Sequence, residues 1–325
     1  MTLLQLYDVA ALKNEVRALA AQRDAVILAH NYQLPEVQDV ADYVGDSLGL
    51  SRQAAASDAA VIAFCGVHFM AETAAVLSPD KTVLIPDLDA GCSLADAITP
   101  AQLAAWQAQH PGAITVMYVN TTAEIKAMTD YCVTSSNAVA VVEHILSEHG
   151  QDTEILFGPD MFLGAYVEKR IGRALHVWDG ECHVHAGIRP KDIEQVRAEH
   201  PGADFLIHPE CGCSTAIMEY SAAGDLAPAG VHMLSTGGML KYAQDAKPGQ
   251  TAIVATEIGM LHPLREAAPD TEFIAANERA ACIYMKMITL PKLRDALRDL
   301  VHEVRVPADV AERARVPIER MIAIS

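Results

Sequence analysis

Three cysteines at near-equal long intervals are the feature that most constrains how this chain can fold. Cys182 lies in the polar run Trp178-Asp179-Gly180-Glu181-Cys182-His183-Val184-His185, with Cys92 90 residues before it and Cys282 100 residues after it. Each of the three follows a short apolar run and stands in a polar loop. This spacing predicts three similar modules, each of which contributes one ligand to a shared centre.

Short apolar segments alternate with helical patterns and repeat in a similar order along the chain. Strands expected at 25–29, 113–119 and 204–207 end in His30, in Tyr118 and Asn120, and in His208. The interval from His30 to Cys92 is 62 residues, and the interval from Tyr118 to Cys182 is 64. The alternation predicts an α/β fold with short parallel sheets in three similar three-layer α/β/α modules. Ligands bind at the carboxyl ends of such strands, where these polar residues stand.

The remaining elements follow from the same periodicities. Further strands are expected at 59–65, 82–85, 154–157, 174–178, 231–234, 252–255 and 273–275. Helices are expected at 8–23, 42–56, 68–77, from a cap at 134–137 through 146, and at 159–169, 191–200, 216–220, 290–301 and 307–324. This order predicts module 1 at residues 1–105, module 2 at 106–188 and module 3 at 189–285. The C-terminal helices at 286–325 are expected to pack back on the body.

The composition excludes several classes of protein. The 325 residues are 51% hydrophobic, enough for a sizeable core, and the net charge of −18 disfavours nucleic acid and anionic membranes as partners. No apolar run reaches the length of a membrane span, and residues 1–8 lack a secretory signal, so a cytosolic location is expected. In that compartment, seven cysteines indicate metal ligands, catalytic groups or buried apolar residues, and not a disulfide framework.

The cysteines divide by their surroundings. Cys65 ends an apolar strand and Cys132 precedes a helix cap, so both are expected to be packing residues. Cys92, Cys182 and Cys282 stand in loops, where a metal triad and simple packing have about equal weight from spacing alone. Three thiolates without a fourth protein ligand are compatible with zinc or with an iron–sulfur cluster that keeps one position open.

The pair Cys211-Gly212-Cys213 is a weaker signal. A redox pair or one accessory ligand are both conceivable from this spacing, but a one-residue separation grips a single ion poorly. We therefore expect these two cysteines to serve neither purpose.

Histidines and hydroxyl groups supply the other candidates. His183 and His185 alternate in an extended segment, so they are expected to face opposite sides. His208 and Glu210 form an acid–base pair if Pro209 keeps the chain extended. Ser47 and Ser135 are candidate helix caps that aim two helix N-termini at an anion, and Ser235-Thr236-Gly237-Gly238 has the composition of an anion cradle. A Rossmann or Walker A pattern is absent, so a nucleotide is not expected.

Taken together, the order and spacing of these motifs resemble the quinolinate synthase family, iron–sulfur enzymes of de novo NAD biosynthesis. The resemblance covers nearly the whole chain. The motifs that carry it are His30-Asn31-Tyr32, Gly45-Asp46-Ser47, residues 64–72, residues 87–93, Tyr118-Val119-Asn120, Thr134-Ser135-Ser136-Asn137, residues 178–185, His208-Pro209-Glu210-Cys211, residues 235–239 and Thr256-Glu257-Ile258-Gly259.

The resemblance implies a fold, a cofactor and a reaction. The family has three α/β/α modules around a pseudo-threefold axis and a [4Fe–4S] cluster held by three cysteines, which correspond here to Cys92, Cys182 and Cys282. The fourth iron is open to substrate and acts as a Lewis acid. The reaction condenses iminoaspartate with dihydroxyacetone phosphate, with loss of phosphate and two waters. It makes the chain a transferase or lyase type of enzyme, in transient contact with the enzyme that supplies iminoaspartate.

The resemblance also assigns site residues. The groups implied to act as acids and bases are Tyr118, His208 and Glu210, with His30 and Tyr32 beside them. The groups implied to bind substrate are His30, Tyr32, Ser47, Tyr118, Asn120, Ser135, His185, His208, Glu210, Ser235 and Thr236. His183 departs from the family pattern, in which a proline stands at this position, and Cys213 is an additional cysteine.

Two other interpretations stay open from the residues alone. A zinc hydrolase would use Cys182, His183 and His185 as metal ligands. A non-catalytic iron–sulfur sensor would bind a small anion but leave Tyr118, His208 and Glu210 without a role.

Overall fold

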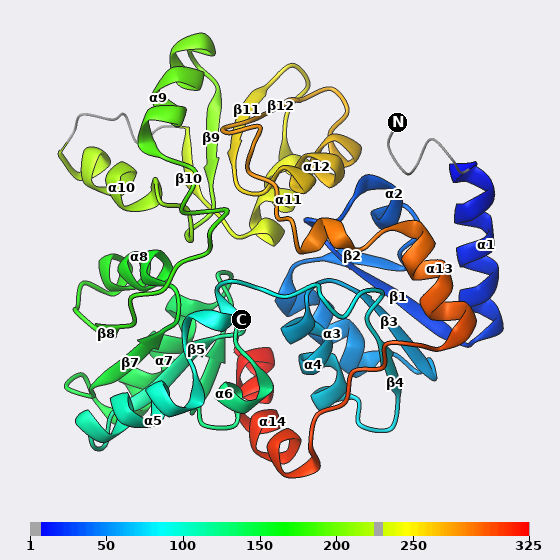
Figure 1. The fold of residues 1–325 in the computed structure, drawn as a ribbon. Helices are drawn as coiled ribbons and strands as arrows, with labels where there is room; N and C mark the ends of the chain where they lie inside the picture. The colour runs from blue at the N-terminus through cyan, green and yellow to red at the C-terminus, as the bar shows by residue number, and fades with distance from the viewer. Residues whose placement is uncertain (1–7, 224–229, 325) are drawn as a thin grey trace.

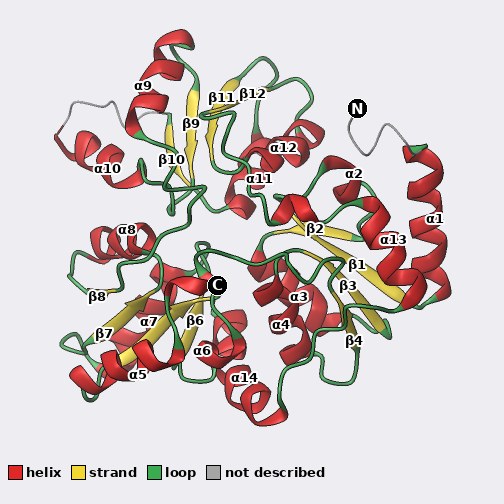
Figure 2. Cartoon of the chain, in the orientation of Figure 1, coloured by secondary structure: helices red, strands yellow, loops and turns green. Residues whose placement is uncertain are grey.

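Three four-stranded parallel sheets with the same strand order make up the computed structural model, which describes residues 8–223 and 230–324. The orders are β2-β1-β3-β4, β6-β5-β7-β8 and β10-β9-β11-β12. Figure 1 shows the three sheets in separate lobes around a common centre, and Figure 2 shows the helices that flank each of them. The predicted α/β fold with three similar modules is confirmed.

The first sheet is built on two strands that are buried along almost their whole length. Its strands are β1 (Ala25–His30), β2 (Tyr43–Gly45), β3 (Val61–Cys65) and β4 (Thr82–Leu84). Its helices are α1 (Val9–Gln22), α2 (Pro35–Gln38), α3 (Ser47–Ala56) and α4 (His68–Leu77). β1 and β3 are nearly continuous apolar runs because helices cover both faces of a parallel sheet.

The second and third sheets repeat this plan. The second has β5 (Ile114–Tyr118), β6 (Tyr131–Val133), β7 (Ile155–Gly158) and β8 (His176–Val177), with α5 (Pro100–Gln109), α6 (Ala123–Lys126), α7 (Ala138–His149) and α8 (Met161–Ile171). The third has β9 (Asp204–Ile207), β10 (Val231–Met233), β11 (Thr251–Ala255) and β12 (Glu272–Ala275), with α9 (Pro190–Glu199), α10 (Ser214–Ala223), α11 (Thr236–Asp245) and α12 (Leu261–Ala267).

Two C-terminal helices pack against the earlier lobes. α13 (Leu290–Asp299) lies along α1, and α14 (Ala308–Ala323) lies against α6, β6, α3 and α4 (Figure 1). Leu293 and Leu297 of α13 are fully buried, and each such side chain contributes roughly 1.5–3 kcal/mol to folding. The predicted module boundaries stay a prediction, and the one at 105/106 falls inside α5.

A short repeat of identical spacing joins each cysteine to the next helix. Ile98, Ile188 and Ile288 stand six residues after Cys92, Cys182 and Cys282, and all three isoleucines are buried. The residue after each isoleucine is the N-cap of α5, α9 or α13. Each cysteine loop is thus anchored to the core at its far end.

Several local predictions were wrong. Residues 43–45 form β2 and not the start of a helix, because the Asp46 side chain caps α3 by accepting a hydrogen bond from Gly49 N at 2.8 Å. The helices α2, α5, α6, α11 and α12 and the strand β6 were not predicted. Within the described residues, no helix combines the length and apolar character needed to cross a membrane. The cytosolic location stays a prediction.

Candidate functional site

The carboxyl ends of the three sheets' main strands open into one pocket. His30 ends β1, Tyr118 ends β5 and His208 directly follows β9, and all three line the pocket. The space between the lining residues is about 690 Å³, part of it open to solvent. The three strand-end positions picked out in the sequence are therefore brought together.

The three cysteine loops enter this pocket with the same backbone geometry. The carbonyls of Cys92, Cys182 and Cys282 accept from the fourth residue after each of them, at 3.1, 2.9 and 3.1 Å. The carbonyls two residues before each cysteine, those of Ala90, Gly180 and Ala280, also accept hydrogen bonds, at 2.8–2.9 Å. In each case the donor is a backbone N–H near the start of a neighbouring helical segment. All three cysteines line the pocket, one from each lobe.

The environment of the three thiols fits a metal centre. Burial raises the pKa of the Cys92 thiol, and the neighbouring Cys182 raises it further. Burial raises the pKa of Cys282 to about 11. Because the three thiols influence one another, a bound cationic centre would relieve the cost of ionising all three. Cys65 and Cys132 are fully buried in β3 and β6 and do not line the pocket, as expected for packing residues.

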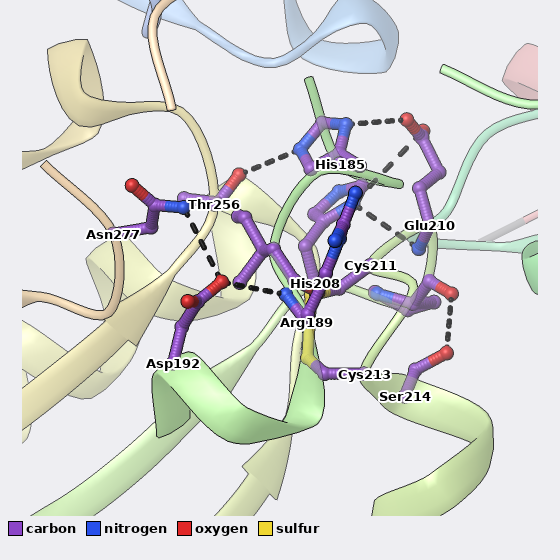
Figure 3. Close-up of a disulfide and its surroundings, with 12 residues drawn as sticks. His185, Arg189, Asp192, His208, Glu210, Cys211, Cys213, Ser214, Thr256 and Asn277 are labelled. Carbon is purple, nitrogen blue, oxygen red and sulfur yellow. Dashed lines mark hydrogen bonds and ion pairs between the residues drawn. A yellow bond between two sulfur atoms is a disulfide. The ribbon is translucent and has the colours of Figure 1, made fainter. Parts of the chain in front are cut away.

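A buried carboxylate connects two of the lobes. Glu210 is 2% exposed, and its Oε1 accepts a hydrogen bond from the Tyr118 hydroxyl. Its Oε2 lies 3.1 Å from His185 Nδ1, an ion-pair distance, whereas His208 Nδ1 lies 3.9 Å from Oε1 (Figure 3). The rings of His185 and His208 stack with centroids 4.9 Å apart.

The nearest partners of Glu210 are therefore not the one predicted, which was His208. The chain turns at Pro209 and is not extended, since Cys211 N donates to His208 O at 2.9 Å. This turn carries Glu210 toward Tyr118 and His185, which come from β5 and from the Cys182 loop. Glu210 and His208 still lie side by side, but His185 is the nearer histidine.

The charge states in this network follow from burial and neighbours. Burial raises the pKa of Glu210, but the two histidines and the hydrogen bonds together lower it to about 2. Burial lowers the pKa of His208 to about 4, so this ring is neutral at pH 7. Burial and the charge of Glu210 hold the pKa of Tyr118 well above its usual value. At neutral pH the network thus contains an ionised Glu210, a protonated Tyr118 hydroxyl and a neutral His208.

A second hydrogen-bonded group lies on the other side of His185. The Tyr32 hydroxyl is 2.5 Å from Thr256 Oγ1 and 3.2 Å from His185 Nε2, and Thr256 Oγ1 is 2.9 Å from the same nitrogen. Burial lowers the pKa of His185, but the acidic groups around the ring raise it well above its usual value. His30 packs edge-on against Tyr32 with centroids 4.6 Å apart, and burial lowers its pKa to about 3.

Further polar groups face the pocket on its remaining sides, and one of them has no internal partner in the described part of the chain. Asn120 Oδ1 is buried and has no hydrogen-bond partner among the described residues. Ser135 Oγ lies 3.1 Å from His208 Nε2. Ser47 and Thr236, the first residues of α3 and α11, also line the pocket. These groups can bind a polar ligand, since an unpaired buried acceptor is costly without one.

The three predicted serine roles need correction. Ser47 is the first helical residue, and Asp46 is the cap of α3. Ser135 lies in the turn before α7, whose cap position is Asn137. Ser235 is outside the pocket lining because its hydroxyl caps α11, accepting from Gly238 N at 3.2 Å. The glycines at 237 and 238 belong to the first turn of that helix and not to a free loop.

Cys211 and Cys213 form a disulfide, contrary to the expectation from the sequence. Figure 3 shows it next to the turn that carries His208 and Glu210. Gly212 N, between the two cysteines, donates to His185 O at 3.0 Å. The pair closes a tight loop that holds the backbone of Gly212 against that of His185, and both cysteines are buried.

Two buried carboxyl groups behind the cysteine loops were missed by sequence reasoning. Glu257 Oε1 accepts from Cys282 N at 2.9 Å, and Lys286 Nζ lies 3.0 Å from the same oxygen. Asp160 is fully buried, accepts from Leu163 N at 2.6 Å, and pairs with Gly180 in an isolated parallel bridge. The motif at 256–259 contained the signal for Glu257, whereas nothing in the sequence pairs Asp160 with the Cys182 loop.

The ligand set of the zinc-hydrolase interpretation is not assembled. His183 is exposed and its Nδ1 contacts Ser93, whereas His185 is 2% exposed and turns to Glu210. Around Cys182, the three residues whose ligand atoms do lie within 4.8 Å of one another are Cys182, His185 and Glu210, so Glu210 stands where the interpretation expected His183.

Comparisons with known proteins agree on one family. The model of the quinolinate synthetase A protein family matches residues 14–323. A quinolinate synthase of Thermus thermophilus is 55% identical over 314 residues, 97% of each chain. A quinolinate synthase of Mycobacterium tuberculosis is 55% identical over 311 residues, 95% of this chain and 88% of the relative.

Proposed function

The chain belongs to the quinolinate synthetase A family, so quinolinate synthesis is its function, and on that premise we propose how its pocket carries out the reaction. The proposed substrates are iminoaspartate and dihydroxyacetone phosphate. They combine with loss of one phosphate and two waters, which balances all atoms of quinolinate. The alternatives of a zinc hydrolase and a non-catalytic sensor are not favoured by this family membership.

We propose that Cys92, Cys182 and Cys282 hold a [4Fe–4S] cluster. The observation that carries this proposal is that three loops with the same two backbone hydrogen bonds deliver one thiol each to the same pocket. Three cysteine ligands leave one iron of such a cluster without a protein ligand, and when bound it would supply a Lewis acid for a carboxylate or a leaving hydroxyl. Glu257 supports this site by holding the Cys282 loop through its backbone N–H.

Proton transfer is assigned to the Tyr118–Glu210–His208 group. Dehydration and tautomerisation require a proton to leave a carbon or nitrogen atom of the intermediate and to be delivered to a different atom, such as the oxygen of a leaving hydroxyl. The Tyr118 hydroxyl can relay a proton from a substrate atom to Glu210, whose negative charge is balanced by the adjacent His185. Neutral His208, hydrogen-bonded to Ser135, can accept a proton at neutral pH.

Substrate binding is assigned to the polar wall of the pocket. Ser47, Ser135 and Thr236 stand at or beside the starts of α3, α7 and α11, where backbone N–H groups favour carboxylate and phosphate oxygens. The unpaired Asn120 Oδ1 can accept from an amine or hydroxyl of an intermediate. Since His30, Tyr32 and His185 are buried, this side of the pocket excludes water and protects the imine from hydrolysis. Because the imine is easily hydrolysed in water, we also propose a transient contact with the enzyme that supplies iminoaspartate.

The test is an anaerobic purification followed by two measurements on one sample. We expect a brown protein with an iron–sulfur absorption band that forms quinolinate from the two substrates. Cys182→Ala is expected to lose both properties, whereas Cys65→Ala, which alters a buried cysteine outside the pocket, should keep both. A colourless protein that holds stoichiometric zinc and forms no quinolinate would refute the proposal.

A further inference from the structure

His183, directly after Cys182, contacts both of the other cysteine loops. Its Nδ1 lies 2.7 Å from the hydroxyl of Ser93, the residue after Cys92. Its ring packs edge-on against Tyr284, two residues after Cys282, with centroids 5.8 Å apart and planes at 87°. One side chain thus joins the cysteine loops of all three lobes.

The contacts lie on the outer side of the cysteine loops. His183 is exposed and Ser93 and Tyr284 are partly exposed, whereas His185, two residues further on, is 2% exposed. Ser93, His183 and Tyr284 nevertheless line the same pocket as the three cysteines. The three side chains therefore belong to the solvent-accessible part of the pocket that the thiols share.

Each loop is fixed to its own lobe by backbone hydrogen bonds, but these do not fix the loops relative to one another. The Cys92 loop hydrogen-bonds to His68 at the start of α4, and the Cys182 loop hydrogen-bonds to Met161 at the start of α8. Three thiols that share one centre need a constant separation, and that requires a contact between lobes.

We propose that His183 is a positioning residue that ties the three cysteine loops together and covers the solvent side of their thiols. Ser93 and Tyr284 are the two attachment points. The identity of the group that the thiols hold rests on the proposed function. The contacts of His183 with Ser93 and Tyr284, which we call the tie, involve the chain alone. An exposed hydrogen bond and one aromatic contact are enough to change a local opening equilibrium by about threefold to tenfold.

The first test uses the cluster-free protein, so that it does not depend on the cofactor. Cys92, Cys182 and Cys282 are alkylated anaerobically with iodoacetamide, and the rate at each thiol is followed by mass spectrometry of its peptide. In His183→Ala we expect all three thiols to react about threefold to tenfold faster than in the parent protein. Acceleration at Cys182 alone would overturn the proposal, since that is the local effect of trimming an adjacent side chain.

A matched control and a second variant separate the tie from general destabilisation. His232→Ala removes another partly exposed histidine that packs on a tyrosine, Tyr242, with centroids 5.3 Å apart, and should leave the three rates within twofold of the parent. Ser93→Ala should accelerate Cys92 and Cys182, and the double variant Ser93→Ala/His183→Ala should react no faster than His183→Ala. Additive effects in the double variant would mean that the two side chains act separately. If His183→Ala fails to fold by circular dichroism, Ser93→Ala carries the test.

The second test uses the cluster-loaded protein. After exposure to air, the iron–sulfur absorbance of His183→Ala is expected to decay about threefold to tenfold faster than that of the parent, and equal decay would overturn the covering role. If the parent protein itself never acquires this absorbance, the proposed cofactor fails, while the alkylation rates still decide whether the loops are tied.

Discussion

Replacing Glu210 by glutamine is the sharpest test of the proton-transfer network. Glu210→Gln keeps the shape of a side chain that is 2% exposed but removes its charge and one of its acceptor oxygens. The carboxylate receives the Tyr118 hydroxyl on one oxygen and faces His185 Nδ1 at 3.1 Å with the other. The amide nitrogen of glutamine can donate but not accept a hydrogen bond, so one of these two donors is left without an acceptor.

Two magnitudes follow from this geometry. A buried donor left without an acceptor costs about 1–3 kcal/mol of folding stability. Loss of a positioned acid–base group lowers the rate by about 10²–10⁴-fold, which corresponds to roughly 3–5 kcal/mol in the activation barrier. We therefore expect a folded protein with a modest loss of stability and a turnover reduced at least about a hundredfold.

The assay is quinolinate formation under anaerobic conditions, normalised to the iron–sulfur absorbance of each sample. The control is Glu154→Gln, which changes a 57% exposed side chain next to the opposite end of β7, and its turnover should stay within twofold of the parent. A Glu210→Gln enzyme with a full cluster and turnover within threefold of the parent would refute the assigned role.

Three further predictions test other parts of the structure. Denatured, cluster-free protein purified without reductant should show five free thiols with Ellman's reagent, since Cys211 and Cys213 are paired; seven would contradict the disulfide. Urea unfolding should show stability falling as pH drops from 6.5 to about 4, because the unfolded chain takes up protons at His208 and His30 that the folded chain refuses. His208→Asn should reduce this loss of unfolding free energy by the His208 share, on the order of a few kcal/mol. Leu293→Ala, a fully buried site between α13 and α1, should cost about 2–5 kcal/mol of unfolding free energy, whereas the more exposed Val301→Ala should change it by less than about 0.5 kcal/mol.

The parts of the fold that were predictable from sequence are those with a strong local period. The continuous apolar runs at β1, β3 and β9 and the amphipathic α1 were placed within one or two residues. The edge strands β2 and β6 were missed, although the equally short β4 and β10 were placed, so strand length alone does not explain the miss. The formation of β2 and β6 depends on pairing with β1 and β5, which the local sequence does not show. The isoleucines six residues after each cysteine were an unused signal of the repeat.

The site was predictable as a set of positions but not as a set of contacts. The predicted strand ends identified His30, Tyr118 and His208, because the position of a residue after an apolar strand can be read directly from the order of residues in the chain. The partners of Glu210 come from positions 25 and 92 residues away in the chain, and only the turn at Pro209 directs the carboxylate toward them. Side-chain direction at the end of a strand depends on the following turn, which the period of the strand does not determine.

Equivalent positions in the three lobes carry either the same residue throughout or pairs of residues that differ from lobe to lobe, and this division matches two different tasks. Each cysteine has the same two backbone hydrogen bonds around it and the same buried isoleucine after it, so the lobes present three equivalent thiols to one pocket. At the strand ends, the equivalent pairs are His30 with Tyr32, Tyr118 with Asn120, and His208 with Glu210, all of which line the pocket. A symmetric cofactor needs equal ligands, whereas two unlike substrates must be held in one orientation by unlike groups. Exchanging the side chains of one strand-end pair for those of another should therefore abolish turnover while the three thiols still hold their centre. Retention of activity after such an exchange would show that the asymmetry of these pairs does not orient the substrates.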